Sequence, residues 1–153
     1  MVQPASIVVR LATSADLRTL CDLYGQLHPG DPSWPSEKAA ADALSKVLGH
    51  ETSTVFICEA YGRAVSTAML VVCPNFTRSG RPFAIIENVV THRDHRKSGY
   101  GRHVMEHAID FARQQGCYKV TLTTGRRDAE TLRFYEGLGM RRDTRTAFEV
   151  RFD

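Results

Sequence analysis

Hydrophobic positions along the first two thirds of the chain switch between two periods. Short runs that are β-branched or alternate apolar with polar side chains are typical of strands, and they cover residues 6–12, 54–60, 64–73 and 82–91. Spacings of three and four residues, typical of helices, follow a capping box that begins at Thr13. A second helix is expected over residues 35–50, with a proline in its first turn. The three residues Tyr61-Gly62-Arg63 separate two strands, which predicts a hairpin.

The last third contains the strongest helix pattern. Residues 101–115 place five apolar side chains on one face, and Gly116 follows as a cap: Val104, Met105, Ala108, Phe111 and Ala112. Strands are expected at 118–123 and 146–152, with a short one near Met140, and a helix at 128–137 that begins with an Asp cap. The order β-α-α-β-β-β-α-β-α-β-β predicts an α/β (α+β) mixed sheet. The strands flanking the long helix should be parallel, through a right-handed crossover.

Length and composition narrow the class of protein. The 153 residues suit a single domain over 1–153, and 42% hydrophobic with 24% charged residues is near the average of globular proteins. No apolar run is long enough to cross a bilayer, and residues 1–10 lack a signal-peptide pattern, so a cytoplasmic protein without membrane partners is expected. The interspersed charges, with a net charge of +3, do not favour nucleic acid as a partner.

Two further patterns, the cysteines and a pair of histidines, could suggest thiol or metal chemistry, but their surroundings argue against both. The four cysteines lie far apart in apolar segments, which indicates reduced core residues rather than disulfides or nucleophiles. His103 and His107 have the spacing of a zinc-peptidase motif, but they lie on the polar side of the long helix, so no metal is expected.

A glycine-punctuated loop precedes the long helix, with the sequence Arg96-Lys97-Ser98-Gly99-Tyr100-Gly101. Such a loop can turn consecutive N–H groups toward one point at the positive end of the helix dipole, which suits a pyrophosphate. Taken alone, glycines before a helix more often form an ordinary turn than a phosphate site.

Several motifs in order give a more specific result. The strand ending Glu87-Asn88-Val89-Val90-Thr91, the glycine loop, the amphipathic helix, Tyr118-Lys119-Val120 and the Phe134–Met140 run together resemble the acetyl-CoA core of the GNAT family of N-acetyltransferases. The resemblance runs from about residue 83 to 141. It is closest to small-molecule acetyltransferases, including glucosamine-phosphate N-acetyltransferases, and it implies the GNAT acyl-CoA N-acyltransferase fold.

The resemblance also implies a cofactor site for acetyl-CoA. Val89 and Val90 would pair through their backbones with the pantetheine arm, and residues 96–101 would hold the pyrophosphate. Asp128, Thr131 and Phe134 match cofactor-contacting positions. The family often has Asn and Ala where this chain has Asp128 and Thr131, so Asp128 is also expected to cap a helix.

Two side chains are the candidate catalytic groups. Alternation along 82–91 places Glu87 in one row with Ile85 and Val89, where desolvation would raise the pKa of the carboxylate and make it a better base for an ammonium acceptor. The alternative is a strand-edge carboxylate paired with an arginine. Tyr135 matches the family's proton donor to the departing thiolate, and the alternative is a core tyrosine with its hydroxyl bonded.

The acceptor site is expected from the first two helices, with Tyr24, His28, Trp34 and Asn88 as candidates. The predicted activity is direct transfer of an acetyl group to a primary amine of a small molecule. The alternatives are a protein or peptide amine as acceptor, or a non-catalytic acyl-CoA sensor. A C-terminal edge strand favours a homodimer.

Overall fold

The computed structural model describes residues 6–152. Residues 1–5, part of the segment used to predict the cellular location, and Asp153 lie outside the described residues. The described chain forms two compact units, divided between Thr121 and Leu122. The interpretation as one domain over 1–153 stays a prediction.

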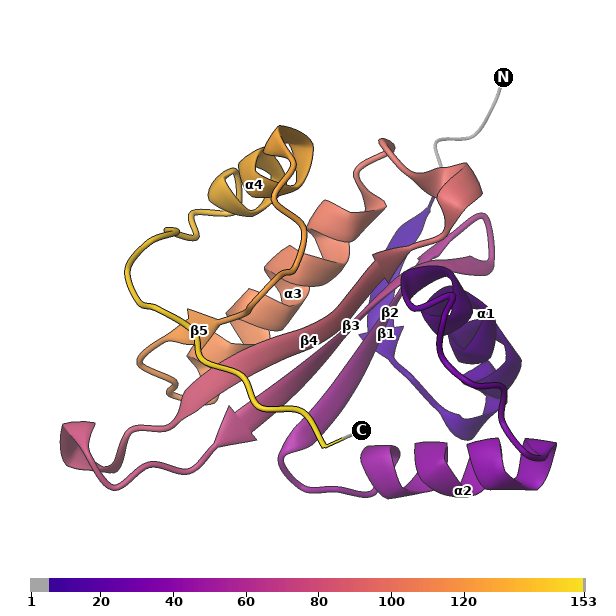
Figure 1. Ribbon diagram of the computed structural model, residues 1–153, viewed down its shortest axis with the longest axis horizontal. Helices are drawn as coiled ribbons and strands as arrows, with labels where there is room; N and C mark the ends of the chain where they lie inside the picture. Colours follow the sequence, from indigo (N-terminus) through magenta and orange to yellow (C-terminus); the bar gives the residue numbers. More distant parts are fainter. Residues whose placement is uncertain (1–5, 153) are drawn as a thin grey trace. The chain divides into compact units, whose positions relative to one another are not determined.

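The first unit is built on a five-stranded mixed sheet with the strand order β1-β2-β3-β4-β5 (Figure 1). The strands are β1 Ile7–Leu11, β2 Ser53–Ala60, β3 Arg63–Cys73, β4 Phe83–Thr91 and β5 Val120–Thr121. The pairs β1–β2, β2–β3 and β3–β4 are antiparallel, while β4 and β5 are parallel. The prediction of a mixed sheet with a parallel pair around the long helix is confirmed.

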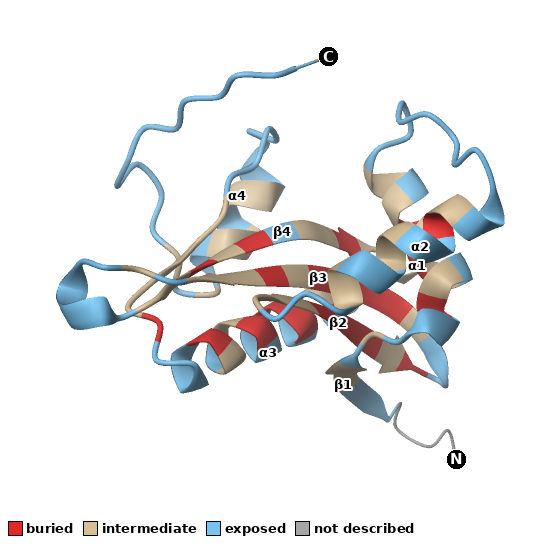
Figure 2. Ribbon diagram, turned by 90° about the horizontal axis from the view of Figure 1, so that it is seen from below, coloured by how far each residue is buried: buried red, intermediate tan, exposed pale blue. Residues whose placement is uncertain are grey.

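Three α-helices cover the two faces of this sheet. Their bounds are α1 Leu17–Leu27, α2 Glu37–Leu48 and α3 Tyr100–Gln114, and short 3₁₀ turns occupy η1 Ser14–Asp16, η2 Arg78–Gly80 and η3 Arg93–His95. Helices α1 and α2 lie on one face, and α3 crosses β2, β3 and β4 on the other (Figure 2). All three helices were predicted to within two or three residues.

Local sequence signals explain where these elements begin and turn. The Thr13 N–H donates to the Asp16 carboxylate at 2.7 Å, which completes the capping box, and Ser36 caps α2 by accepting from the Ala39 N–H at 3.0 Å. The hairpin loop has two residues rather than three, because Ala60 pairs with Arg63. Tyr61 and Gly62 both have positive φ, as a tight hairpin turn requires.

The core of the first unit lies between the sheet and its helices. Large side chains such as Phe56, Leu70 and Ile86 are fully buried, as are the apolar positions of α3 at Val104 and Met105. Burying each such side chain contributes roughly 1.5–3 kcal/mol. The predicted apolar face of α3 is therefore confirmed as the core-facing side.

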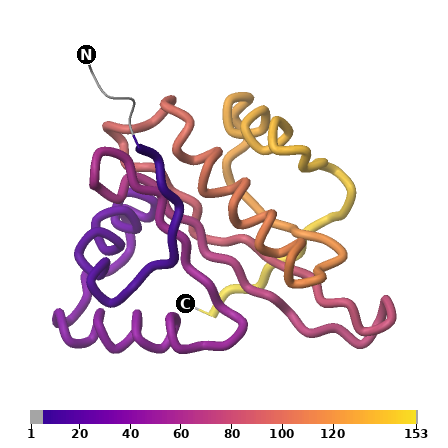
Figure 3. Tube along the Cα trace, turned by 180° about the vertical axis from the view of Figure 1, so that it is seen from behind, coloured from indigo at the N-terminus to yellow at the C-terminus, as the bar shows by residue number. Residues whose placement is uncertain are grey.

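The second unit contains one helix, α4 Ala129–Glu136, which begins at the Asp128 cap as predicted. The strands predicted near Met140 and at 146–152 are wrong, because no strand is formed in residues 122–152. The end of the described chain runs on without a helix or a strand (Figure 3). The run predicted at 118–123 is a strand over two residues only. Strand propensity needs a hydrogen-bonded neighbour to become a strand, and these segments lack one within the described residues.

Among residues 6–152, no helix has the length and apolar character needed to cross a bilayer.

Candidate active site

A β-bulge interrupts β4 at Asn88 and Val89. Thr67 of β3 faces Val90 and Met69 faces Glu87, so the single residue Ala68 faces two residues of β4. Asn88 has φ 54°, in the left-handed region that few residues other than Gly, Asn and Asp adopt readily. The bulge is therefore a local backbone feature that this sequence can accommodate.

The bulge reverses the direction in which the main chain of β4 points. The Ala84 N–H donates to the carbonyl of Lys119, the residue just before β5, at 3.0 Å. The His92 N–H instead donates to the Val65 carbonyl of β3 at 2.8 Å. In a regular strand, two residues separated by an even number would point the same way. The inserted residue therefore directs the Val89 main chain toward the β5 side and that of Val90 toward β3.

The edge of β4 on the β5 side is open beyond the first pairs. The two strands pair only at Ala84 with Val120 and Ile85 with Thr121, and no other strand within residues 6–152 joins that edge. An extended ligand with amide groups can pair with such an edge as an added strand does. By contrast, the Val90 carbonyl accepts a hydrogen bond from the Ser66 hydroxyl at 3.0 Å. The geometry thus favours Val89 over Val90 as a main-chain partner.

The glycine loop leads into α3 with two left-handed residues, Lys97 at φ 62° and Gly99 at φ 85°. The first hydrogen bond within the helix runs from the His103 N–H to the Gly99 carbonyl at 3.1 Å. The N–H groups of Tyr100 and Gly101 therefore have no acceptor within the helix, at the positive end of its dipole. This arrangement suits a phosphate or pyrophosphate group.

Contacts on both sides hold the approach to this loop in place. The Arg96 guanidinium donates to the Thr91 carbonyl at 3.3 Å, and Tyr100 is buried against the sheet. The Arg93 N–H donates to the Gln26 side chain of α1 at 2.8 Å, and His92 lies 3.4 Å from the Asp22 carboxylate. Helix α1 is thus tied to the connection between β4 and α3, while Lys97 and Ser98 are exposed.

Glu87 lies directly before the bulge, and its side chain is exposed. The expected apolar surroundings are wrong, because the bulge breaks the alternation that would have placed Glu87 in one row with Val89. Glu87 forms no salt bridge among the described residues, so the alternative of a carboxylate paired with an arginine is not observed either.

The acceptor candidates do not line one common cavity. Tyr24 is hydrogen-bonded to Thr67, which faces the bulge, and burial raises the pKa of the Tyr24 hydroxyl. Trp34, 55% exposed, lines a separate cavity of about 310 Å³ with Leu17, Arg18, Cys21, Ser36, Glu37 and Ala40. His28 follows the end of α1 and is exposed, and the Asn88 amide donates weakly to the Met69 sulfur at 3.9 Å.

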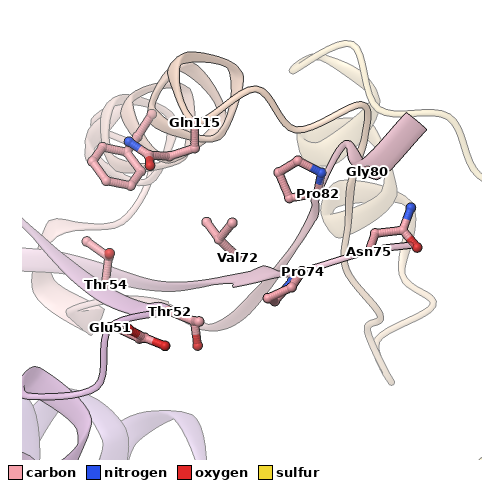
Figure 4. A pocket seen from close by; sticks show the side chains of 10 residues that line it. Glu51, Thr52, Thr54, Val72, Pro74, Asn75, Gly80, Pro82 and Gln115 are labelled. Atoms are coloured by element: carbon pink, nitrogen blue, oxygen red, sulfur yellow. The ribbon is translucent and has the colours of Figure 1, made fainter. Parts of the chain in front are cut away.

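Figure 4 shows another cavity, of about 380 Å³. It is lined by Glu51, Thr52, Thr54, Val72, Pro74, Asn75, Gly80, Pro82, Phe111 and Gln115. Phe111 lies in the last turn of α3 and Gln115 directly follows the helix, roughly 16 Å and 22 Å along the axis from Tyr100 at about 1.5 Å per residue. None of the predicted site residues lines this cavity.

Comparison of the sequence with known proteins identifies its family. The Acetyltransferase (GNAT) family matches residues 17–140. The chain belongs to this family. A glucosamine 6-phosphate N-acetyltransferase from Trypanosoma brucei brucei is 33% identical over 141 residues, which are 92% of this chain and 93% of that one.

Solved structures share the fold of this acetyltransferase. A protein from Agrobacterium tumefaciens str. C58 that is classed with the acetyltransferases has a TM-score of 0.89 and 41% identity, and the match covers 95% of this chain and 99% of that one. The glucosamine-6-phosphate N-acetyltransferase from Arabidopsis thaliana has a TM-score of 0.84 at 23% identity, covering 97% and 99%. GNAT enzymes use acetyl-CoA as the acetyl donor.

In the second unit of this acetyltransferase, Asp128 acts as a helix cap. Its carboxylate accepts from the Thr131 N–H at 2.9 Å, from the Thr131 hydroxyl at 3.0 Å and from Arg126 at 3.1 Å. The hydrogen bond from the Thr131 N–H is the main cause that lowers the pKa of Asp128. Phe134 and Tyr135 are half-buried, with ring centroids 5.1 Å apart in an edge arrangement. Their cofactor and catalytic roles remain predictions.

All four cysteines are free thiols. Cys58 and Cys117 are buried, and burial raises the pKa of the Cys58 thiol to about 11 and that of Cys117 above its usual value. His103 and His107 are exposed on α3, as predicted. No group of three or more metal-ligating side chains occurs within residues 6–152.

Two residues that help to build the site were missed from the sequence. Ser66 and Thr67 are fully buried; Ser66 bonds the Val90 carbonyl, and Thr67 donates to the Phe56 carbonyl at 2.8 Å. The available signal was a pair of adjacent hydroxyl residues inside an apolar strand, since buried hydroxyls need hydrogen-bond partners.

Proposed function

We propose that this acetyltransferase transfers an acetyl group from acetyl-CoA directly to a primary amine of a small molecule, with amino sugar phosphates as the first acceptors to test. One observation carries the proposal: the bulge that turns the Val89 main chain toward the open edge of β4, in the strand that leads to the glycine loop. The relative from Trypanosoma brucei brucei, named a glucosamine 6-phosphate N-acetyltransferase, supports the choice of acceptor.

In this proposal the first unit holds most of the donor. The pantetheine amides pair with the Val89 main chain, and the pyrophosphate accepts from the N–H groups of residues 99–101. Lys97 and Ser98 contribute through the shape of the loop. Asp128, Thr131 and Phe134 complete the donor site by resemblance to the family.

Glu87 is the proposed base. An amine with a pKa near about 10.4 arrives as an ammonium at neutral pH, and only its neutral form attacks a thioester. The Glu87 carboxylate takes the proton, directly or through a water molecule. The nitrogen then bonds to the carbonyl carbon, and the Val89 N–H stabilises the oxyanion of the tetrahedral intermediate.

Tyr135 is the proposed acid. When the intermediate collapses, the carbon–sulfur bond breaks, and the sulfur leaves with the bonding electron pair. The Tyr135 hydroxyl gives its proton to the sulfur. The nitrogen, which is still cationic after the attack, loses its second proton through water to the Tyr135 phenolate, so that free coenzyme A and the neutral amide are the products. No acyl-enzyme forms, and no cysteine is needed as a nucleophile.

The test is thiol release from acetyl-CoA in the presence of glucosamine 6-phosphate, unphosphorylated glucosamine, an aminoglycoside and a lysine peptide. We expect turnover with the first acceptor, and at least about 100-fold slower turnover in Glu87→Gln and Tyr135→Phe. Glu51→Gln and Tyr61→Phe change the same groups at exposed positions outside the proposed site and should leave the rate unchanged. If both pairs of variants behave alike, the assigned roles are wrong.

The same panel separates the alternatives. Turnover confined to the peptide would favour a protein or peptide acetyltransferase. Tight binding of acetyl-CoA without turnover on any amine would favour a sensor. The absence of nucleic-acid and membrane partners, a cytoplasmic location and a homodimer stay predictions.

A further inference from the structure

The N–H groups of the η3 turn, which leads from β4 to the glycine loop, are all hydrogen-bonded. The Asp94 N–H donates to His92 Nδ1 at 3.2 Å, and the His95 N–H donates to the His92 carbonyl at 2.9 Å. The Arg93 N–H donates to the Gln26 side chain of α1 at 2.8 Å. Of these acceptors, only Gln26 comes from a distant part of the chain, so it joins the turn to α1.

The Gln26 side chain is itself held in one orientation. Its Nε2 donates to Asp22 Oδ2, one turn earlier on α1, at 3.0 Å, which directs its carbonyl oxygen to the Arg93 N–H. The same Asp22 oxygen lies 3.4 Å from His92 Nε2. Because His92 Nδ1 accepts a hydrogen bond, neutral His92 has its hydrogen on Nε2, where it faces Asp22. The four residues thus form a closed network between α1 and the end of β4.

Helix α1 packs against β4 and also contacts its bulge (Figure 1). The Tyr24 hydroxyl is hydrogen-bonded to Thr67, which pairs with Val90 in the bulge. Since the Thr67 hydroxyl donates its own hydrogen to the Phe56 carbonyl, Tyr24 is the donor of this bond. Side chains of one helix are therefore bonded at two segments of the proposed donor site, the bulge and the turn before the glycine loop. All of these residues belong to the first unit.

These contacts assign a role to Gln26. We propose that Gln26, oriented by Asp22, is a positioning residue that holds the glycine loop in place for the pyrophosphate. The inference rests on the donor site of the proposed function. Only Asp94 and His95 separate Arg93 from the loop, so a bond that holds Arg93 against α1 restrains where the loop begins. A loop restrained before binding loses less conformational entropy when it closes on a ligand, and its affinity is higher.

Calorimetric binding of coenzyme A to the full chain tests this role. Gln26→Leu removes both polar ends of the side chain at similar size, and it should raise the Kd of coenzyme A by about 2- to 10-fold, which corresponds to the loss of one neutral hydrogen bond. The matched control, Gln114→Leu, lies at an exposed position at the far end of α3 and should leave the Kd unchanged. Urea unfolding checks that both variants are fully folded under the conditions of the titration.

A reversal of polarity gives a second variant that should retain the bond. Gln26→Glu with Asp22→Asn keeps an oxygen for the Arg93 N–H, and it keeps a hydrogen bond between the two side chains, now donated by position 22. The net charge of the pair is unchanged. The Kd of this double variant should stay within about twofold of that of the unsubstituted chain.

Amide hydrogen exchange at Arg93, followed by NMR in the ligand-free chain, tests the contact without a ligand. Exchange should be faster in Gln26→Leu and unchanged in the double variant. Equal exchange rates at Arg93, or equal Kd values in the unsubstituted chain and Gln26→Leu, overturn the inference alone. So does a double variant that binds as weakly as Gln26→Leu. An unsubstituted chain that binds no coenzyme A overturns the proposed donor site and the inference together.

Discussion

The two halves of β4 differ in the regularity of their strand pairing and in the role proposed for each. Residues 83–86 pair in register with β3 on one edge and begin to pair with β5 on the other, and Ala84 and Ile86 are fully buried. Residues 87–91 contain the bulge, the exposed Glu87 and the open edge.

One strand can thus both stabilise the sheet and present main-chain groups to a ligand. The regular half satisfies its hydrogen bonds within the sheet and stabilises it through buried apolar surface. The bulged half leaves main-chain groups available to a ligand. Within the bulged half, the Val90 carbonyl accepts a hydrogen bond from the Ser66 hydroxyl, and the neighbouring Thr67 hydroxyl donates to the Phe56 carbonyl of β2. Five measurements test this difference between the two halves.

The largest effect is expected at the first residue of the bulged half. Glu87→Gln should lower kcat by about 10²–10⁴-fold if Glu87 is the base, yet change the free energy of unfolding by less than about 0.5 kcal/mol because the side chain is exposed. Thiol-release kinetics and denaturant unfolding of the same variant measure both. A stability loss that accounts for the lost activity would contradict the assignment.

At the preceding residue, Ile86, we expect a large loss of stability. Ile86→Ala should reduce the free energy of unfolding by about 2–5 kcal/mol, because Ile86 is 1% exposed and its removal leaves a cavity. Ile85→Ala, at a half-buried position of the same strand, should cost less. Urea unfolding followed by circular dichroism compares the two, and equal losses would argue against the division of β4.

Lowering the pH should reduce the free energy of unfolding through a pair of charged residues, Arg10 and Asp16, beside β1, the edge strand opposite β5. The Asp16 carboxylate is hydrogen-bonded to Arg10, which chiefly lowers the pKa of Asp16, and to the Thr13 N–H. A depressed pKa in the folded state stabilises the protein above the unfolded value of about 3.9, and that stability is lost as the pH falls below it. Asp16→Asn should cost about 1–3 kcal/mol at pH 7 and flatten the acid limb of the stability profile.

The bulge itself can be tested through its left-handed residue. Asn88→Val should cost about 1–2 kcal/mol, because a β-branched side chain is strained at positive φ, whereas Asn88→Gly should be tolerated. If the bulge positions the Val89 main chain, Asn88→Val should also raise the KM for acetyl-CoA. An unchanged KM together with the stability loss would show that the bulge serves only the fold.

The smallest effect compares the two ends of α3. Gly99→Ala and Gly116→Ala place a methyl group at similar positive φ, with no atom within 4 Å of either added carbon, so each should cost about 1 kcal/mol of stability. Only Gly99→Ala should weaken acetyl-CoA binding measured by calorimetry, because Gly116 lies at the far end of the helix. Equal weakening by both would argue against the loop as the pyrophosphate site.

The sequence alone determined the elements whose signals are local. The period of α3, the Thr13 and Asp128 caps and the hairpin turn after Ala60 depend on interactions within a few residues, and each was predicted close to its position. The order of family motifs likewise predicted the GNAT fold and the acetyltransferase family, because motif order is a property of the chain itself.

Only the tertiary structure decided the features that depend on pairing between distant segments. The bulge arises where β3 and β4 pair out of step, and it determines both the exposure of Glu87 and the direction of the Val89 main chain. The same reason explains the short β5 and the missing strands near Met140 and at 146–152. A strand is completed by a neighbour, and sequence periodicity describes one strand without specifying the register or the presence of the other.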